Sequence, residues 1–532
     1  MKINKYIRYE TKYLQTGRKN DVKPYIIKVN NAIKGVIHDQ KAEPIYSYKS
    51  LKNVLEYTNK YNIYSINCHL GQRKLALTEI EFYNKCVNLN NINNIIIYAG
   101  SASCEHLPVI LHMFPKLKFL LIDPNYHSID VDYKYVYQDI NTISKSNHTT
   151  FKTQLKSKNK KRSRHLYNTT KELYNTKFIY DDTQTYNVID IADLPHINKM
   201  KSFKKLFQNY QKNIFDIMVE STNRVFIIQD YMNIPLTLHL KQYIKKSKHV
   251  LKIYFMSDIR SVLIPKFGAS DIDILHNSAL QIIYLKELNP IYSMLKFRPP
   301  FFMQYVEITK LHNNNYEYME HVKDVFDYVI KNYSINIVDN FLNKKFEYFK
   351  NDFIYVQPWA PPVSTESRLF VSQNNISKPF MNYDNIEWEN KFYYFKFIRL
   401  FKYYPFFYEK LKKYPELHYD GCQDCSREIM ILVDYIIQDQ NKDKDYDFDK
   451  LLNKLDESNI HKLIYLYELM NTYTFFDLSK KNYKCSSTRK TPIGIRKIMH
   501  HTHTKHTKYI NFYDKDLNYI SIDDNNNMVK NY

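Results

Sequence analysis

The first half of the chain alternates short apolar runs with segments whose apolar residues recur at helical spacing. Residues 71–86 (GQRKLALTEIEFYNKC) show the mixed helical spacing that predicts a helix. A strand-like run at 94–100 (NIIIYAG) is followed by a helix-like segment at 105–114 (EHLPVILHMF) and a second strand-like run at 117–124 (LKFLLIDP). This β-α-β order predicts neighbouring parallel strands joined by right-handed crossovers.

The same alternation resumes further along the chain. Residues 224–230 and 250–258 predict strands, and 235–246 between them predict a helix. Residues 351–373 (NDFIYVQPWAPPVSTESRLFVSQ) predict a pair of strands around a Pro-rich turn. Three of the predicted strands end in an acid, at the edge where open α/β sheets bind their ligands: Asp123, Asp230 and Asp258.

Composition divides the chain into four regions. Residues 1–65 form a basic, Tyr-rich N-terminal segment, and 66–380 form the α/β domain. Within that domain, 127–220 is polar, basic and poor in aliphatic residues, which predicts an insertion. Its charge suits either phosphate binding or a solvated tether. Residues 381–480 predict an aromatic-rich helical extension, and 481–532 a basic, His-bearing tail.

The chain of 532 residues is strongly basic, with 77 Lys and Arg against 55 Asp and Glu and a formal net charge of +22. That excess favours a polyanionic partner, either nucleic acid or an acidic membrane surface. The 50 Tyr and 31 Phe add rings on which bases stack. No apolar run approaches the roughly 20 residues that cross a bilayer, and the N-terminus lacks the apolar core of a signal peptide. Six cysteines form no disulfide framework, so we expect a soluble protein of a reducing intracellular compartment.

The turn after the first predicted strand is the first candidate for ligand chemistry. Gly100 lies between a strand and a helix, where backbone N–H groups are free to bind a ligand. Asp123 ends the next strand, where nucleoside-binding folds keep the carboxylate for ribose hydroxyls. One glycine and one acid fit an ordinary buried β-α-β unit equally well, so these two residues alone decide nothing.

Six short stretches occur in the same order as the motifs of one known family. They are LGQRKLALTEIEF, IIIYAGSASCEH, LLIDP, IYFMSDIRS, LNPIYSMLKFRPPF and QPWAPPVSTESRLF. They resemble motifs of the poxvirus-type cap-specific mRNA (nucleoside-2′-O-)-methyltransferase, which is also the small regulatory subunit of the viral poly(A) polymerase. The resemblance covers about 66–126 and 221–440. It implies an α/β fold with a Rossmann-like S-adenosylmethionine-dependent methyltransferase sheet.

The resemblance implies a catalytic set of two lysines and two acids: Lys74, Asp258, Lys296 and Glu366. A ribose 2′-hydroxyl is a poor nucleophile, and a lysine can act as its base if a neighbouring cation and partial burial lower the lysine pKa. We expect Lys296 to be that base and Lys74 to be the neighbouring cation. Asp258 is expected to hold the lysines and Glu366 to orient one of them. This chemistry requires no metal.

The resemblance also implies contacts to S-adenosylmethionine, through Gln72, Tyr98, Gly100 and Asp123. The chain departs from the family loop, because Pro-Gly-Thr is replaced by Ser103, Cys104 and Glu105. Losing that glycine predicts a steric or torsional cost of about 1–3 kcal/mol to cofactor binding. Glu105 could offset part of it by binding the cofactor's ammonium group. The family Arg after the ribose acid is Asn125 here.

For the methylguanine cap, the resemblance implies two stacking rings and two carboxylates. Phe301 matches one ring and Glu389 one carboxylate, while the second carboxylate position holds Met303. Stacking a cationic purine on aromatic rings is favourable. The other ring is expected in the N-terminal region, at Tyr46 or Tyr48. Phe301 beside two prolines also fits a plain core aromatic.

Three arginines lie two residues after catalytic positions in the sequence and are candidates for holding the transcript's phosphates: Arg260, Arg298 and Arg368. A separate CQDC motif at Cys422 and Cys425 could suggest zinc, completed by Cys485 or the His500–His506 cluster. A lone CxxC is weak and the other ligands are not at finger or ribbon spacing, so we expect free thiols and no metal.

The resemblance therefore implies a cap-specific mRNA 2′-O-ribose methyltransferase with capped mRNA as substrate and a poly(A) polymerase catalytic subunit as partner. It places the protein in the cytoplasm, in a viral factory, or in the virion. Two alternatives remain. The altered loop fits a catalytically inactive RNA-binding subunit of a viral poly(A) polymerase, and a methyltransferase acting on another RNA position would use the same residues.

Overall fold

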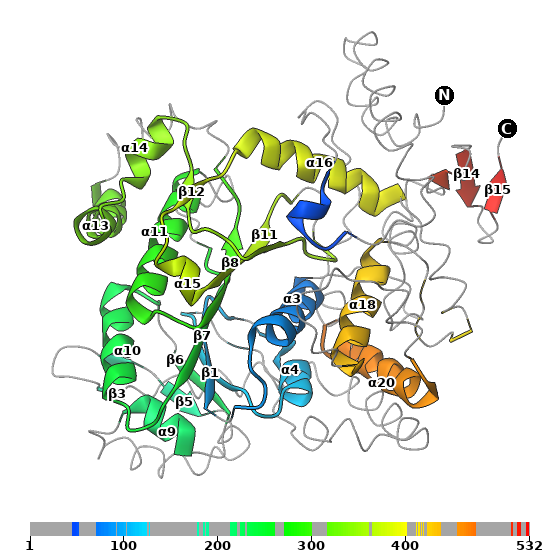
Figure 1. The fold of residues 1–532 in the computed structure, drawn as a ribbon, viewed down its shortest axis with the longest axis horizontal. Coiled ribbons are helices and arrows are strands. Elements are labelled where there is room, and N and C mark those ends of the chain that lie inside the picture. The colour runs from blue at the N-terminus through cyan, green and yellow to red at the C-terminus, as the bar shows by residue number, and fades with distance from the viewer. Residues whose placement is uncertain are drawn as a thin grey trace, which may run out of the picture.

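The computed structural model contains a central eight-stranded sheet with helices on both faces (Figure 1). The strands lie in the order β10-β11-β8-β7-β1-β2-β6-β5. In that order their bounds are Phe353–Tyr355, Ser367–Ser372, Tyr292–Phe297, Lys252–Ser257, Asn94–Ala99, Lys118–Ile122, Val225–Ile228 and Val188–Asp190. The structure describes residues 45–52, 71–91, 93–102, 104–124, 127, 178–179, 185–186, 188–190, 213–220, 224–228, 231–260, 271–300, 316–360, 364–401, 411, 413–414, 417, 419, 423–437, 455–474, 512–513, 519–522 and 528–530.

The centre of the sheet is parallel, and its edges are antiparallel. Neighbours within β8-β7-β1-β2-β6 all pair parallel, whereas β10 and β11 at one edge and β5 at the other pair antiparallel. The predicted β-α-β unit is confirmed by β1, α4 (Leu107–Met113) and β2. The predicted strand pair at 351–373 is confirmed as well, because Phe353 of β10 lies opposite Phe370 of β11. This mixed α/β sheet is consistent with a Rossmann-like fold.

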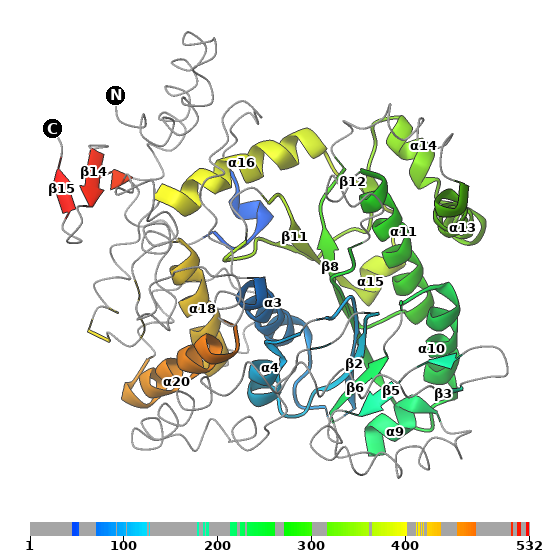
Figure 2. The same cartoon turned by 180° about the vertical axis from the view of Figure 1, so that it is seen from behind.

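Two helical layers cover the two faces of the sheet (Figures 1 and 2). One layer contains α3 (Gly71–Cys86), α4, α18 (Gln423–Ile437) and α20 (Glu457–Thr474). The other contains α9 (Ile214–Glu220), α10 (Ile234–Lys246), α11 (Asp271–Leu288), α13 (Tyr316–Tyr333), α14 (Ile337–Leu342), α15 (Gln373–Ile376) and α16 (Asn385–Phe401).

Side chains along a strand pack alternately against the two helical layers. In β1, Ile96 and Tyr98 pack with the α3 layer, while Ile95 and Ile97 pack with the α10 layer. Successive side chains of a strand point to opposite faces, so a strand covered on both sides is apolar throughout. This explains why the run at 94–99 is continuous rather than alternating.

Local sequence signals fix the start of helix α10. Asn233 has an extended backbone, and its side chain accepts a hydrogen bond from Leu236 N at 2.9 Å. Pro235 follows in the first turn, where a missing N–H costs nothing because that N–H has no helical partner.

The range 127–220, predicted as an insertion, contributes to the main sheet. Its residues form the antiparallel edge strand β5 and helix α9, together with a small hairpin of β3 (Phe178–Ile179) and β4 (Thr185–Tyr186). The basic stretch at 152–177 lies outside the described residues.

The C-terminal helices share the core of the α/β domain. Arg73 of α3 donates from Nε to Glu428 Oε2 of α18 at 2.8 Å, and both side chains are buried. Arg73 also donates to Asn471 Oδ1 of α20 at 3.0 Å. Trp359 Nε1 completes the group by donating to Glu428 Oε2 at 2.8 Å. One buried ion pair thereby joins α18 and α20 to the helix that carries Lys74.

Short elements complete the described part of the fold. They are η1 (Tyr48–Ser50), the pair β9 (Glu347–Tyr348) and β12 (Met381–Asn382), and the three strands β13 (Phe512–Tyr513), β14 (Tyr519–Ile522) and β15 (Met528–Lys530). Among the described residues, no helix has the length and apolar character needed to cross a membrane.

Candidate active site

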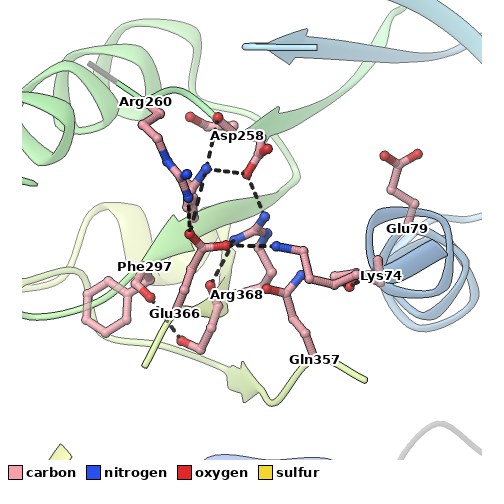
Figure 3. A network of polar contacts seen from close by, with 12 residues as sticks. Lys74, Glu79, Asp258, Arg260, Phe297, Gln357, Glu366 and Arg368 are labelled. Carbon is pink, nitrogen blue, oxygen red and sulfur yellow. Dashed lines mark hydrogen bonds and ion pairs between the residues drawn. The ribbon is translucent and has the colours of Figure 1, made fainter. Parts of the chain in front are cut away.

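Charged side chains from four separate parts of the chain meet at the carboxyl edge of the parallel strands (Figure 3). Lys74 comes from α3, and Asp258 directly follows β7. Lys296 lies near the end of β8, and Glu366 directly precedes β11. The structure thus brings together all four residues predicted to be catalytic.

Direct ion pairs connect the four side chains. Lys296 Nζ lies 2.9 Å from Asp258 Oδ1 and 3.7 Å from Glu366 Oε2. Lys74 Nζ lies 3.1 Å from Glu366 Oε1. Each of these side chains is at most 20% exposed. The ion pairs are therefore mostly buried, but a ligand can still contact them from solvent. Lys296 therefore lies between Asp258 and Glu366, and Glu366 also pairs with Lys74.

A buried arginine underlies the cluster. Arg368 pairs with Lys296 in the register of β11 and β8. Its Nη1 lies 2.9 Å from Glu366 Oε1, its Nη2 lies 2.5 Å from Asp258 Oδ1, and only 1% of the side chain is exposed. The phosphate contact predicted for Arg368 does not fit this burial, because both ends of the guanidinium already hold carboxylates. Its role in this structure is to position Asp258 and Glu366.

Arg260 approaches the same cluster from the solvent side. Its Nη2 lies 2.9 Å from Glu366 Oε2, and 55% of its side chain is exposed. A cation in this place can reach an anionic ligand at the mouth of the site while it remains paired with Glu366. The predicted phosphate contact of Arg260 stays compatible with the geometry.

The cations keep both acids ionised. Burial alone would raise the pKa of Glu366, but Lys296, Lys74 and the arginines lower it well below its ordinary value. Burial acts in the same direction on Asp258, and Lys296 and Arg368 lower the Asp258 pKa below its usual range. The cluster therefore carries two negative charges at neutral pH, against several positive ones.

Lys296 has the opposite shift. Burial lowers the pKa of Lys296 from its ordinary 10.5 and outweighs the opposing pull of Asp258 and Glu366. The cations that add to this lowering are Arg260 and Arg368. The sequence predicted that burial and Lys74 would lower this pKa. Burial is confirmed as the main cause, but the cations that add to it are the two arginines rather than Lys74.

Gly100 lets two strand ends meet beside Asp258. Its φ is +75°, and a Cβ built on it would lie 2.7 Å from Ile259 N and 2.8 Å from the carbonyl carbon of Asp258. The Asp258 N–H in turn donates to Ala99 O at 2.9 Å. Any larger residue at position 100 would push apart the backbone that places Asp258.

The loop after Gly100 carries the predicted departure from the family motif. Cys104 has φ +53° and a buried side chain. A non-glycine residue in this left-handed region costs the fold about 1–2 kcal/mol. The predicted cost of this loop to cofactor binding stays a prediction. Burial raises the pKa of the Cys104 thiol, and Glu79, Asp123 and Glu105 raise it further. Cys104 is therefore a neutral, packed side chain.

The predicted cofactor residues lie around this loop. Asp123 is buried, and its Oδ2 accepts a hydrogen bond from Ala102 N at 3.1 Å, so the acid of β2 adjoins the turn of β1. Tyr98 is buried in β1 directly before that turn. Gln72, in the first turn of α3, contacts the loop through His106, with Oε1 and Nδ1 2.7 Å apart. All four predicted residues therefore share one end of the sheet.

Sequence reasoning missed His106 and Glu79. The buried His106 ring bridges Gln72 Oε1 and Glu79 Oε1, each at 2.7 Å. Arg368 was named, but its inward role was missed. The sequence did contain a signal for this inward role. Residues 366 and 368 are two apart at the start of a strand, so their side chains point to the same face of the sheet.

The predicted cap residues are only partly described. Phe301 and Met303 lie outside the described residues. Glu389 of α16 is buried. Arg298 is partly buried, and its charge interacts with those of Asp271, Glu366 and Glu389. Arg298 therefore interacts electrostatically with both the catalytic cluster and the predicted cap carboxylate.

The two candidates for the second stacking ring already pack within the protein. Tyr48 stacks on Trp388 with ring centroids 4.6 Å apart, and Lys391 Nζ lies 4.4 Å from the Tyr48 centroid. The guanidinium carbon of Arg427 lies 5.3 Å from the ring centroid of Tyr46. Each ring already has a cation near it, and Tyr48 also stacks on Trp388, so a stacked base would compete with these contacts.

The cysteine candidates give no metal centre among the described residues. Cys425 is a buried free thiol in α18. Within the described ranges, no group of three or more His, Cys, Asp or Glu is arranged to hold a metal. Cys422, Cys485 and the His500–His506 cluster lie outside those ranges.

The sheet and the cluster together define an α/β protein of Rossmann-like architecture with a lysine–carboxylate site at the carboxyl edge of its strands. A family model described as Poly A polymerase regulatory subunit matches residues 40–169 and 168–340, which is more than half of the chain. The chain belongs to the poly(A) polymerase regulatory subunit family. A comparison with curated proteins finds no match.

Proposed function

We propose that this regulatory subunit is also an S-adenosylmethionine-dependent cap-specific mRNA 2′-O-ribose methyltransferase that acts in the cytoplasm. The observation that carries the proposal is the position of Lys296. Its amine lies 2.9 Å from Asp258 and 3.7 Å from Glu366, and burial lowers its pKa. A positioned amine with a lowered pKa is what deprotonation of a ribose hydroxyl needs.

The chain's residues divide the work of that reaction. Neutral Lys296 Nζ accepts the proton of the 2′-hydroxyl as its oxygen becomes the nucleophile. Asp258 and Glu366 fix the direction of the amine, and they stabilise the ammonium that forms. Arg368 fixes both acids from below, and Lys74 pairs with Glu366 from the side of α3.

The end of the sheet where β1 and β2 adjoin fits a nucleoside cofactor. Gln72, Tyr98, Gly100 and Asp123 would hold S-adenosylmethionine there, because the Gly100 turn lies beside Asp258 and the Asp123 carboxylate binds the same loop at Ala102 N. When bound, this cofactor supplies an activated methyl group, so the protein needs only to position and deprotonate the acceptor.

The regulatory role implies a second partner. The family description supports binding to a poly(A) polymerase catalytic subunit, and the net charge of +22 supports binding to RNA. Capped mRNA is the proposed methyl acceptor.

Methyl transfer from S-adenosylmethionine to capped and uncapped RNA tests the proposal. We expect methylation of capped RNA by the wild type and its loss in Lys296→Ala. Lys286→Ala is a matched control, because Lys286 is also partly buried but donates to Ile376 O away from the cluster. Full activity of Lys296→Ala would refute the base, and equal methylation of uncapped RNA would refute cap specificity.

The inactive RNA-binding subunit is favoured by one observation, the left-handed Cys104 in the loop. Calorimetry with S-adenosylmethionine separates it from the enzyme. An absence of binding at millimolar cofactor would decide for the inactive subunit.

A further inference from the structure

A buried glutamine connects the ends of the two strands that lead to Asp258 and Lys296. Gln281 lies in α11, and only 2% of it is exposed. Its Nε2 donates to Ser257 Oγ at 3.0 Å and to Lys296 O at 3.3 Å. Ser257 is the last residue of β7 and directly precedes Asp258. One amide group therefore binds both strands at the end where the candidate active site lies.

The backbone pairing of these two strands stops just before the site. The last paired residues of β7 and β8 are Ser257 and Leu295. The next N–H of β7, that of Asp258, donates to the last carbonyl of β1 at 2.9 Å. At this point the amide of Gln281 supplies a donor to Lys296 O. A side chain of α11 thus extends the connection between β7 and β8 by one residue.

The hydrogen-bond partners fix the orientation of the Gln281 amide. A backbone carbonyl can only accept a hydrogen bond, so the Nε2 end must face Lys296 O. The Oε1 end then accepts a hydrogen bond from the hydroxyl of Tyr348 at 2.7 Å. Tyr348 is itself buried, and its ring stacks on Phe297 with ring centroids 5.6 Å apart. The amide is therefore held in one orientation, because turning it over would place two acceptors together.

Packing alone does not account for a glutamine at this position. Buried aliphatic residues flank it in α11, among them Ala279, Ile282 and Ile283. Burying a polar amide is unfavourable unless its hydrogen bonds are satisfied. The bonds of this amide go to the two strand ends of the site. An aliphatic residue of similar size would fill the space but would remove the donor from Lys296 O.

We propose that Gln281 is a positioning residue of the methyl-transfer site, which fixes the backbone of Lys296 relative to that of Asp258. Lys296 Nζ lies 2.9 Å from Asp258 Oδ1, and this contact depends on where the two strand ends lie. Misplacing a reacting group by about 1 Å can lower a rate about a hundredfold. Tyr348 acts one step further away, by orienting Gln281. This inference rests on the function proposed above.

Gln281→Met and Tyr348→Phe test this role. Methionine is a flexible, unbranched side chain like glutamine but cannot donate a hydrogen bond. We expect Gln281→Met to lower kcat for methyl transfer about tenfold or more, with KM for capped RNA and for S-adenosylmethionine nearly unchanged. Tyr348→Phe should lower kcat less, because both Nε2 hydrogen bonds remain. Rates are expressed per cofactor-binding site counted by calorimetry, so that unfolded protein does not contribute.

Tyr284→Phe is the matched control for Tyr348→Phe. Tyr284 is a buried residue of α11, and its hydroxyl donates to Met232 O in the segment between β6 and α10. The substitution removes a buried hydrogen bond that involves neither strand end of the site. Its kcat should therefore stay at the wild-type value.

The pKa of Lys296 gives a readout that does not depend on methyl transfer. Competitive acetylation of the protein's amines across pH, followed by mass spectrometry of the Lys296 peptide, measures this pKa. Burial is the largest influence on it and lowers it. A Lys296 that is less firmly placed should lose part of this lowering. We therefore expect a higher Lys296 pKa in Gln281→Met than in the wild type or in Tyr284→Phe.

The two readouts separate this inference from the function it rests on. Wild-type kcat and a wild-type Lys296 pKa in both Gln281→Met and Tyr348→Phe would overturn the positioning role, even if the variants unfold at lower urea concentration. If the wild type methylates no RNA, the proposed function fails, and the Lys296 pKa in Gln281→Met then decides the positioning role. If Gln281→Met does not fold, Tyr348→Phe decides it.

Discussion

Lys74 and Glu366 are 292 residues apart in the sequence and 3.1 Å apart in the structure. Their ion pair joins helix α3 to the segment that enters β11. Through Glu366 the pair also reaches Lys296, whose amine lies 3.7 Å away. The spacing between these charges is therefore set by the whole sheet rather than by any local motif.

The pH dependence of methyl transfer should report the Lys296 pKa. The base is the neutral amine, so the rate should rise with pH below this pKa and level off above it. Because burial lowers the pKa from 10.5, the plateau should begin below that value. Asp258 and Glu366 have lowered pKa values, so they should add no acid limb near neutrality.

Lys296→Arg is the sharpest variant for this profile. It keeps the charge but has no neutral form at these pH values, so we expect the rate to fall by about 10²–10⁴-fold without a plateau. A profile in Lys296→Arg that matches the wild type would assign the observed titration to another group.

Arg368 should set the pH profile from its buried position. Removing it in Arg368→Met takes one shared counter-ion from the two acids around Lys296, and they then hold the lysine proton more strongly. We expect the plateau to begin at higher pH and kcat to fall, with KM for RNA nearly unchanged. Arg368→Lys should restore part of the rate.

Arg260→Met is the comparison for Arg368→Met. Arg260 also lowers the Lys296 pKa but is largely exposed, so its loss should move the profile less and raise KM for RNA more. If Arg368→Met lowered only protein stability and left the profile in place, Arg368 would have a structural role alone.

The backbone of Cys104 should carry strain that a glycine relieves. Its φ of +53° is unfavourable for cysteine and free for glycine, so Cys104→Gly should raise the free energy of unfolding by about 1 kcal/mol. Urea denaturation measures this gain. Cys104→Ala removes the thiol but keeps the unfavourable φ, so its free energy of unfolding should not rise.

Equal gains in the two Cys104 variants would contradict the torsional explanation. They would assign the cost to the volume or the polarity of the thiol instead.

Removing one charge of the buried Arg73–Glu428 pair should destabilise the protein more than removing both. Breaking it in Glu428→Leu leaves the Arg73 charge in the core without its carboxylate, which should cost about 3–5 kcal/mol of unfolding free energy. The double variant Arg73→Met/Glu428→Leu should recover much of that loss, because neither charge remains buried alone.

Urea denaturation of the two single variants and the double variant measures this coupling. Losses that simply add in the double variant would show that the two charges act independently. Glu457→Gln, at a side chain that is 87% exposed, should leave the midpoint unchanged.

The sequence alone determined the β-α-β order, the strand pair at 351–373 and the sites of the four charged residues. These follow from local information: apolar runs of fixed period and motifs in a fixed order. Each signal involves residues close in the chain, where spacing constrains geometry directly.

Only the tertiary structure decided which partner each charge has. Arg368 was predicted to contact phosphate, but it turns inward because β11 pairs with β8 and sets it opposite Lys296. Gln72 meets His106, and Arg73 meets Glu428, across 34 and 355 residues of chain. Such pairs depend on which helix covers which face of the sheet. That choice is made by packing of the whole core, for which a local stretch of sequence contains no sign.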